Sequence, residues 1–214
     1  MILLNYFNIM DRDNICIATQ FITMKRTGGN LKQTTNAVAN GNWFVRNMAG
    51  YKVIMRVLFG VVWLVDAGLK WQPAFFNGFE SMIQSSMIQQ PSWIMPWFHF
   101  WINVTSSDPY LFALFIALAE TLIAFAILFG FMRKIVYILG AIFSFFIWSI
   151  PEGFGGFYIY GATDVGTSII YVLVFLMLIL INGAFGSSKY SLDYYIEKKY
   201  RNWSKLAEFN PGEK

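Results

Sequence analysis

Charged residues, histidine and cysteine are all scarce in this chain. Only 13% of its 214 residues are charged, whereas a soluble domain contains about 25%. The one cysteine, Cys16, excludes an internal disulfide and a CxxC redox pair. The one histidine, His99, lies outside any HxxxH motif, so the chain offers no evident ligand set for a metal or haem. We therefore predict no metal centre.

Motifs for several common activities are also absent. The sequence contains no GxGxxG, GxxxxGK or GxSxG pattern, which leaves nucleotide binding and serine-hydrolase chemistry without support. No segment combines basic and aromatic residues in the manner of a nucleic-acid-binding module. We expect no nucleic-acid partner, although the formal net charge is +4.

Hydrophobic residues make up 57% of the chain and occur in long runs. Each run approaches the roughly 20 residues that an α-helix needs to cross about 30 Å of hydrocarbon. The runs do not alternate apolar and polar residues, as strands of a membrane barrel do. The pattern predicts an all-α membrane protein, a four-helix transmembrane bundle. The four expected spans are Tyr51–Leu69, Leu111–Phe131, Ile135–Ile150 and Val165–Ile181.

Lysine and arginine placement predicts the orientation of this bundle. Basic residues precede the first run, separate the second from the third, and follow the fourth. The two remaining loops contain only Lys70. Because cytoplasmic loops are enriched in Lys and Arg, we expect a multi-pass plasma-membrane protein with both termini cytoplasmic.

The membrane domain, residues 49–184, is flanked by two expected cytoplasmic tails, residues 1–48 and residues 185–214. In the second tail, Ser191–Leu206 is expected to form a helix. The first outer loop begins with an amphipathic segment from Phe75 to Met87, and we expect this helix to lie in the membrane interface. The aromatic segment that follows, around His99, fits either an interfacial belt or a lid over a lipid-soluble ligand.

Ionisable residues within the apolar runs point to functional sites, because charges at membrane depth are costly. Arg56 lies about 9 Å and Glu120 about 15 Å from the inner ends of their helices, at 1.5 Å per residue, which predicts a buried pair. Asp66 and Lys70 are four residues apart and share a helix face. These last two residues belong to the outer end of the bundle.

The loop Pro151–Tyr171 is rich in glycine and aromatic residues and carries Glu152 and Asp164. Its backbone amides would go unpaired in lipid, so the loop must lie at a surface or line a pocket. We expect its two carboxylates to join Asp66 and Lys70 in one outer polar cluster. Structural roles remain open alternatives. Lys70 can snorkel to the headgroups, Asp164 can cap a helix, and the Arg56–Glu120 pair can set helix register.

Two sequence stretches carry a resemblance to a known family. One is the pattern FGxxWLxxxGxxKW, at Phe59–Trp71, within MRVLFGVVWLVDAGLKWQP. The other is the loop sequence PEGFGGFYIYGATDVGTSIIY. Together with a central glutamate in the second run, they resemble the DoxD branch of the DoxD/DoxX membrane family. The resemblance covers roughly Arg46 to Asn182.

This resemblance implies a four-helix protein that is the large subunit of a thiosulfate:quinone oxidoreductase. Such an enzyme joins two thiosulfates to tetrathionate and passes the electrons to a membrane quinone. A DoxA-like small subunit is the implied partner, and sulfur-oxidising archaea are the implied hosts. One alternative is a non-catalytic membrane subunit of a larger respiratory oxidase complex. Another is a small transporter with Arg56 and Glu120 along its path.

For the oxidoreductase, the candidate catalytic residues are those of the outer polar cluster. Thiosulfate is a dianion and needs positive charge, and Lys70 is the one cation of the outer loops. Helix N-termini add partial positive charge for an anion such as thiosulfate. A quinone needs hydrogen-bonding groups within an apolar cleft. The catalytic candidates are Asp66, Lys70, Glu152 and Asp164. The candidates for the quinone site are Glu120, Arg56, Trp63, Trp71, Phe157 and Tyr158.

Overall fold

The computed structural model describes residues 43–156, 158–159, 162–185 and 188–209. Nearly all of the first expected tail, including Cys16, lies outside the described residues, as does Phe157. The chain divides into two compact units, Met1–Met48 and Ala49–Lys214. The described residues contain helices and loops and no strand, which confirms the predicted all-α class.

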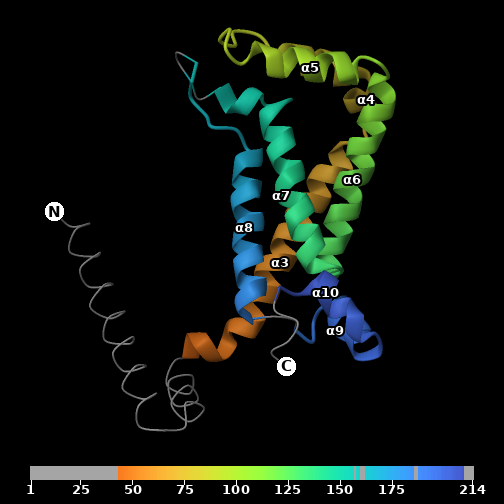
Figure 1. Ribbon diagram of the computed structural model, residues 1–214, viewed down its shortest axis with the longest axis vertical. Coiled ribbons are helices and arrows are strands. Elements are labelled where there is room, and N and C mark those ends of the chain that lie inside the picture. Colours follow the sequence, from red (N-terminus) through yellow and green to blue (C-terminus); the bar gives the residue numbers. More distant parts are fainter. Residues whose placement is uncertain (1–42, 157, 160–161, 186–187, 210–214) are drawn as a thin grey trace, which may run out of the picture. The chain divides into compact units, whose positions relative to one another are not determined.

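All four apolar runs form long helices, as predicted. Three of them, α6, α7 and α8, run side by side in Figure 1, with α3 behind them. Within the described residues, α6 is the one helix both long and apolar enough to cross a membrane, and an apolar stretch of α8 is shorter. The bounds are Trp43–Leu69 for α3, Pro109–Phe129 for α6, Arg133–Ser149 for α7 and Ser168–Phe185 for α8.

Local signals set both ends of α6. The Asp108 side chain accepts a hydrogen bond from the Leu111 amide (3.0 Å) and so caps the first turn, and Pro109 occupies the first helical position. At the other end Gly130 has a φ of 65°, the left-handed conformation that commonly ends a helix. The helix is 21 residues long, which corresponds to about 30 Å.

An aromatic cluster joins α3 to α8. The Phe175 ring lies 5.0 Å from the Phe59 ring and 5.1 Å from the Trp63 ring, between centroids. Tyr171 adds a further contact, 5.1 Å from Trp63. Edge-on aromatic pairs of this kind stabilise beyond the area that they bury. On its other side, Phe175 packs against the backbone of Gly140 in α7.

We expect Gly140→Ala to destabilise the protein. A β-carbon at Gly140 would lie 2.2 Å from Cζ of Phe175, so α7 and α8 would have to move apart. Overpacking of this kind costs about 1–3 kcal/mol. Gly68→Ala in α3 is the matched control, because nothing lies within 4 Å of that position. Thermal unfolding of purified protein should show a lower midpoint for Gly140→Ala only. Equal midpoints for the two variants would contradict this packing.

Two shorter helices, α4 (Pro73–Ser85) and α5 (Met95–Thr105), connect α3 to α6. In Figure 1, α5 lies across one end of the long helices. The amphipathic segment is helical as predicted, and its apolar stripe buries Phe79 and Ile83 in a cluster with Ala113 of α6. The helix ends at Ser85, and the chain continues in turns to Gln89.

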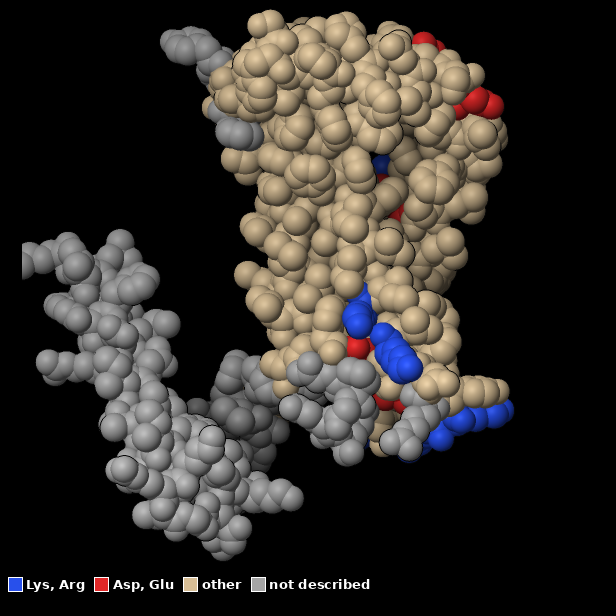
Figure 2. All heavy atoms as spheres, viewed as in Figure 1, with Lys and Arg blue, Asp and Glu red and all other residues tan. Residues whose placement is uncertain are grey.

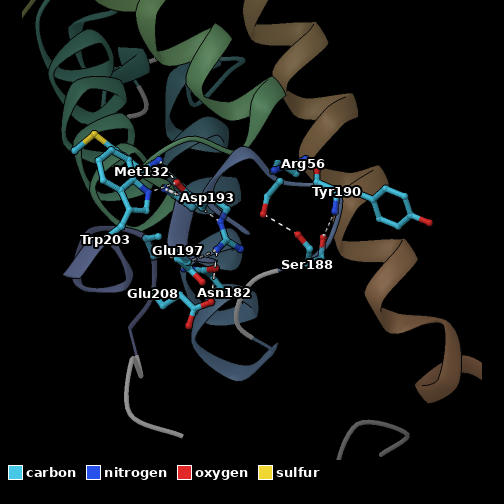
Figure 3. A network of polar contacts seen from close by, with 12 residues as sticks. Arg56, Met132, Asn182, Ser188, Tyr190, Asp193, Glu197, Trp203 and Glu208 are labelled. Carbon is cyan, nitrogen blue, oxygen red and sulfur yellow. Dashed lines mark hydrogen bonds and ion pairs between the residues drawn. The ribbon is translucent and has the colours of Figure 1, made fainter. Parts of the chain in front are cut away.

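At the opposite end, the C-terminal segment folds as α9 (Leu192–Lys199), η2 (Arg201–Trp203) and α10 (Ser204–Ala207). The prediction of one continuous helix over Ser191–Leu206 was wrong. Tyr200 adopts an extended conformation, with φ −126° and ψ 96°, and interrupts it. The break turns the chain back on itself, so that Trp203 reaches the side chain of Asp193, one of the buried contacts in Figure 3.

The outer surface of the long helices is unusually apolar. In Figure 2 the middle of the molecule is almost free of charge, and basic residues gather at the end that carries α9 and α10. Large side chains more than half exposed occur on each of the four long helices. They include Leu58, Val65, Leu122, Phe129, Leu139, Leu173 and Leu180.

Candidate functional site

Lys70 lies at the centre of a small cluster of charges just beyond the end of α3. Its Nζ is 3.3 Å from Oδ1 of Asp66 and 3.6 Å from Oε2 of Glu120. The contact with Asp66, four residues earlier, confirms the predicted shared face. The contact with Glu120 joins α3 to the middle of α6. We call Asp66, Lys70 and Glu120 the Lys70 cluster.

Glu120 is the most deeply buried member of the cluster. Its side chain is 1% exposed, and neither carboxylate oxygen accepts a hydrogen bond from any described residue. In the part of the chain that the structure describes, its one ion-pair contact is the ammonium group of Lys70. Burying a carboxylate is costly unless hydrogen bonds and an opposite charge compensate it. Glu120 is therefore a group that can take up a proton or accept a hydrogen bond from a bound molecule.

The predicted Arg56–Glu120 pair was wrong. Arg56 lies near the other end of the bundle, where its Nη2 donates a hydrogen bond to the Tyr190 carbonyl (2.8 Å). Helices α3 and α6 pack in a different register from the expected one. Gly60 packs against Leu128 and Arg56 packs against Gly130, so Arg56 is level with the end of α6. Glu120, about 15 Å further along α6, is out of reach.

The predicted cluster of four outer residues was also wrong, because Glu152 is engaged elsewhere. Its carboxylate accepts hydrogen bonds from the amide (3.1 Å) and the hydroxyl (2.7 Å) of Ser168. The first amides of a helix have no partner within the helix, and an acidic side chain there satisfies them. Glu152 therefore caps α8, whose first residue is Ser168 and not the expected Val165.

Asp164 lies in an exposed turn before α8. Its Oδ1 accepts hydrogen bonds from the amides of Val165 (2.6 Å) and Gly166 (3.2 Å). Among the described residues, neither Asp164 nor Glu152 forms an ion pair with Lys70.

The glycine-rich loop is held in a folded-back conformation. Trp148 donates a hydrogen bond from Nε1 to the Val165 carbonyl (2.7 Å). Gly155, with a φ of 67°, lies directly against the backbone of Val165, where a β-carbon would be 2.1 Å from the carbonyl carbon. Only glycine tolerates both the close approach and the positive φ. The glycine content of the loop thus has a structural reason.

The aromatic residues expected around a quinone are not gathered in one place. Trp63 is buried among Phe59, Tyr171 and Phe175, and its Nε1 bonds to no residue in the described ranges. Trp71 is 45% exposed and donates a hydrogen bond to the Thr121 hydroxyl (2.9 Å).

Tyr158 lies apart from these two tryptophans, in the glycine-rich loop. Its hydroxyl donates a hydrogen bond to Oε1 of Gln90, and its ring contacts Trp93. Burial raises the pKa of the Tyr158 phenol, so the hydroxyl keeps its proton for this bond. Phe157, the remaining aromatic candidate, lies outside the described part of the chain.

A cavity of about 280 Å³ lies between α4, α5, α6 and α7, and the sequence alone did not locate it. Its wall is almost wholly apolar. Trp101 of α5 lines it, and the buried Nε1 of this residue has no hydrogen-bond partner within the described chain. The aromatic segment around His99 was the available signal, since one reading of it was a lid. Other lining residues include Phe79, Ile83, Phe112, Phe115, Ile116 and Phe146.

The cavity and the Lys70 cluster both include side chains of α6. Ile116 lines the cavity, and Glu120 follows it by one helical turn on a neighbouring part of the same face. Figure 2 shows a hollow in the same half of the molecule as α5, with basic and acidic atoms visible inside it. An apolar cavity near a buried carboxylate and an ammonium group is chemically suited to a lipid-soluble ligand that exchanges protons.

No protein-family model, curated protein or solved structure matches this chain. Among the described residues, no group of three or more His, Cys, Asp and Glu side chains is arranged to hold a metal ion.

Proposed function

We propose that the protein is a multi-pass membrane protein whose four spans are α3, α6, α7 and α8. The exposed apolar side chains of these helices support this assignment, because water disfavours such a surface and lipid does not. The concentration of Lys and Arg at the end with α9 and α10 supports a cytoplasmic location for that end. Lys70 and the cavity then belong to the outer half of the bundle.

We further propose that the chain is the membrane subunit of a quinone-linked oxidoreductase. The observation that carries this proposal is Glu120, a buried carboxylate with unused acceptors beside an apolar cavity. A quinone that takes up two electrons also takes up two protons. In the proposed reaction the Lys70 cluster supplies these protons to a ring held in the cavity.

The cavity has the properties that a quinone ring requires. An engineered cavity of about 150 Å³ holds benzene, so a chamber of about 280 Å³ has room for a substituted ring. The free indole N–H of Trp101 can donate a hydrogen bond to a ring carbonyl. Phe115 lines the chamber and is 63% exposed, which marks an opening through which an isoprenoid tail reaches the lipid.

Thiosulfate is the electron donor that the family resemblance implies. Two thiosulfate dianions would lose two electrons and join through a new S–S bond to form tetrathionate. The Lys70 cluster contains two carboxylates and one ammonium group, so it does not attract a dianion when both acids are ionised. We therefore propose that the sulfur substrate binds outside this cluster, with a DoxA-like small subunit contributing to its site.

A second candidate function is a non-catalytic membrane subunit of a larger respiratory oxidase complex. The C-terminal segment favours it, because Tyr190, Tyr195 and Tyr200 are exposed there. Tyrosine is enriched in protein–protein interfaces. Purification from native membranes separates the two candidates. Co-purification with a haem or copper oxidase, without any quinone binding by the isolated subunit, would favour the second.

Trp101→Phe should weaken binding of a quinone analogue about tenfold. The substitution keeps an aromatic ring in the cavity wall and removes the N–H donor, a loss of about 1–1.5 kcal/mol. Trp93→Phe is the matched control, since Trp93 is 67% exposed and does not line the cavity. Calorimetric titration of the purified protein with a short-chain quinone gives Kd for each variant. Identical Kd values for wild type and Trp101→Phe would remove Trp101 from the site.

A further inference from the structure

Arg56 is a buried cation without a carboxylate partner in the described part of the chain. Its side chain is 5% exposed. Nη2 donates to the Tyr190 carbonyl, while Nε has no hydrogen-bond partner among the residues that the structure describes. Burying a guanidinium without a compensating anion is costly. The glycine at position 130 makes room for the Arg56 guanidinium, since a β-carbon there would be 1.5 Å from Nη1 of Arg56.

The neighbouring arginine shows the contrast. Arg133 is also buried, and its Nε is 2.9 Å from Oδ2 of Asp193. Glu208 and Glu197 lie 3.7 Å and 3.9 Å from its Nη2. Figure 3 shows these acidic residues on one side of the network, with Arg56, Tyr190 and Ser188 on the other. The acidic residues of this end of the molecule therefore compensate Arg133, and Arg56 pairs with none of them.

Arg56 lines a small cavity of about 20 Å³ together with other polar groups. A cavity needs roughly 10–15 Å³ to hold one water molecule, so this one has room for one or two oxygen atoms. Lys52 precedes Arg56 by one helical turn, which places both cations on the same face of α3. The polar lining consists of Lys52, Arg56, Arg133, Tyr137, Asn182 and Ser188.

We propose that Arg56 and Lys52 bind a tetrahedral oxyanion in this cavity. One or two oxygens of the anion enter the cavity, and the rest of the group stays at its mouth. The guanidinium fork is suited to phosphate and sulfate oxygens, and the anion supplies the charge that Arg56 otherwise lacks. Two sources have this chemistry, the phosphate of an anionic lipid and a free phosphate or sulfate ion.

Binding is tested on the full-length protein by thermal unfolding in two series. In detergent, inorganic phosphate is titrated. In nanodiscs, phosphatidylcholine alone is compared with a mixture containing phosphatidylglycerol. We expect the unfolding midpoint of the wild type to rise with at least one of these ligands, because a ligand that binds the folded state stabilises it. A rise with phosphate identifies a free anion, and a rise with phosphatidylglycerol alone identifies the lipid headgroup.

Arg56→Gln should abolish this rise, and Lys198→Gln should retain it. Lys198 is an exposed basic residue of α9 that does not line the cavity. If Arg56→Gln does not fold, Lys52→Gln replaces it, with an expected loss of affinity of at least tenfold. The proposal is overturned if neither ligand stabilises the wild type, or if the cavity variants respond as Lys198→Gln does. Arg56 bonds to Tyr190 and does not line the large apolar cavity, so the earlier assignment of Arg56 to the quinone site was wrong. Quinone binding should be unchanged in Arg56→Gln, so the two proposals fail separately.

Discussion

Glu120→Gln is expected to lower thiosulfate-dependent quinone reduction about a hundredfold or more, since a positioned proton donor contributes roughly 10²–10⁴ to a rate. Glutamine keeps the shape of the side chain and cannot transfer a proton. The remaining Asp66–Lys70 pair is still joined at 3.3 Å, so we expect the bundle to fold. The rate is measured in membranes that contain the chain and its small-subunit partner, with a quinone analogue as acceptor.

Glu80→Gln is the control for this experiment. Glu80 lies on the exposed face of α4 and accepts a hydrogen bond from Gln84, away from the cavity lining. Glu80→Gln should leave the rate of quinone reduction unchanged. Lys70→Met provides a second test, because it removes the one cation that lies beside Glu120. If Glu120→Gln and Lys70→Met both retain the wild-type rate while binding quinone normally, the Lys70 cluster has no part in proton transfer.

Asp193→Ala is expected to lower the free energy of unfolding by about 3–5 kcal/mol, the usual cost of leaving one member of a buried ion pair alone. Asp193 is fully buried and joins α9 to the start of α7. Its carboxylate accepts hydrogen bonds from the amides of Met132 and Arg133, from Nε of Arg133 and from Nε1 of Trp203. Removing it leaves the Arg133 guanidinium buried with weaker compensation.

Thermal unfolding and limited proteolysis together measure this effect. The midpoint should fall for Asp193→Ala, and cleavage after Lys198 or Lys199 should become faster as α9 leaves the bundle. Asp164→Ala is the matched control, because Asp164 is exposed and bonds only to the amides of its own turn. A normal midpoint with unchanged proteolysis in Asp193→Ala would show that the segment is held by its apolar contacts alone.

The expected helices were largely correct because their signals are local. Asp108, Pro109 and Gly130 mark the ends of α6, and the observed bounds differ from the expected ones by two residues at each end. The pair of Asp66 and Lys70 was also predictable, since residues four apart meet on any helix. The start of α8 was missed because Glu152, sixteen residues before Ser168, supplies its cap.

Contacts between helices were less predictable, since they depend on register. A shift of one residue moves a side chain by about 1.5 Å along the axis and rotates it by about 100°. The depth estimate placed the inner end of the first span near Tyr51, whereas Arg56 is already level with Gly130 at the end of α6. That difference separates Arg56 from Glu120 and brings Lys70 to Glu120 instead.

The sequence by itself determined that the chain is helical, where its long apolar helices lie, and which end of the bundle is basic. These properties follow from composition and from signals within a few residues. Only the tertiary structure decided that Glu120 meets Lys70 and that Trp101 faces a cavity beside α6. It also decided that Arg56 has no carboxylate partner among the described residues. Each of these depends on how one helix packs on another, and packing is determined by the shapes of many side chains together.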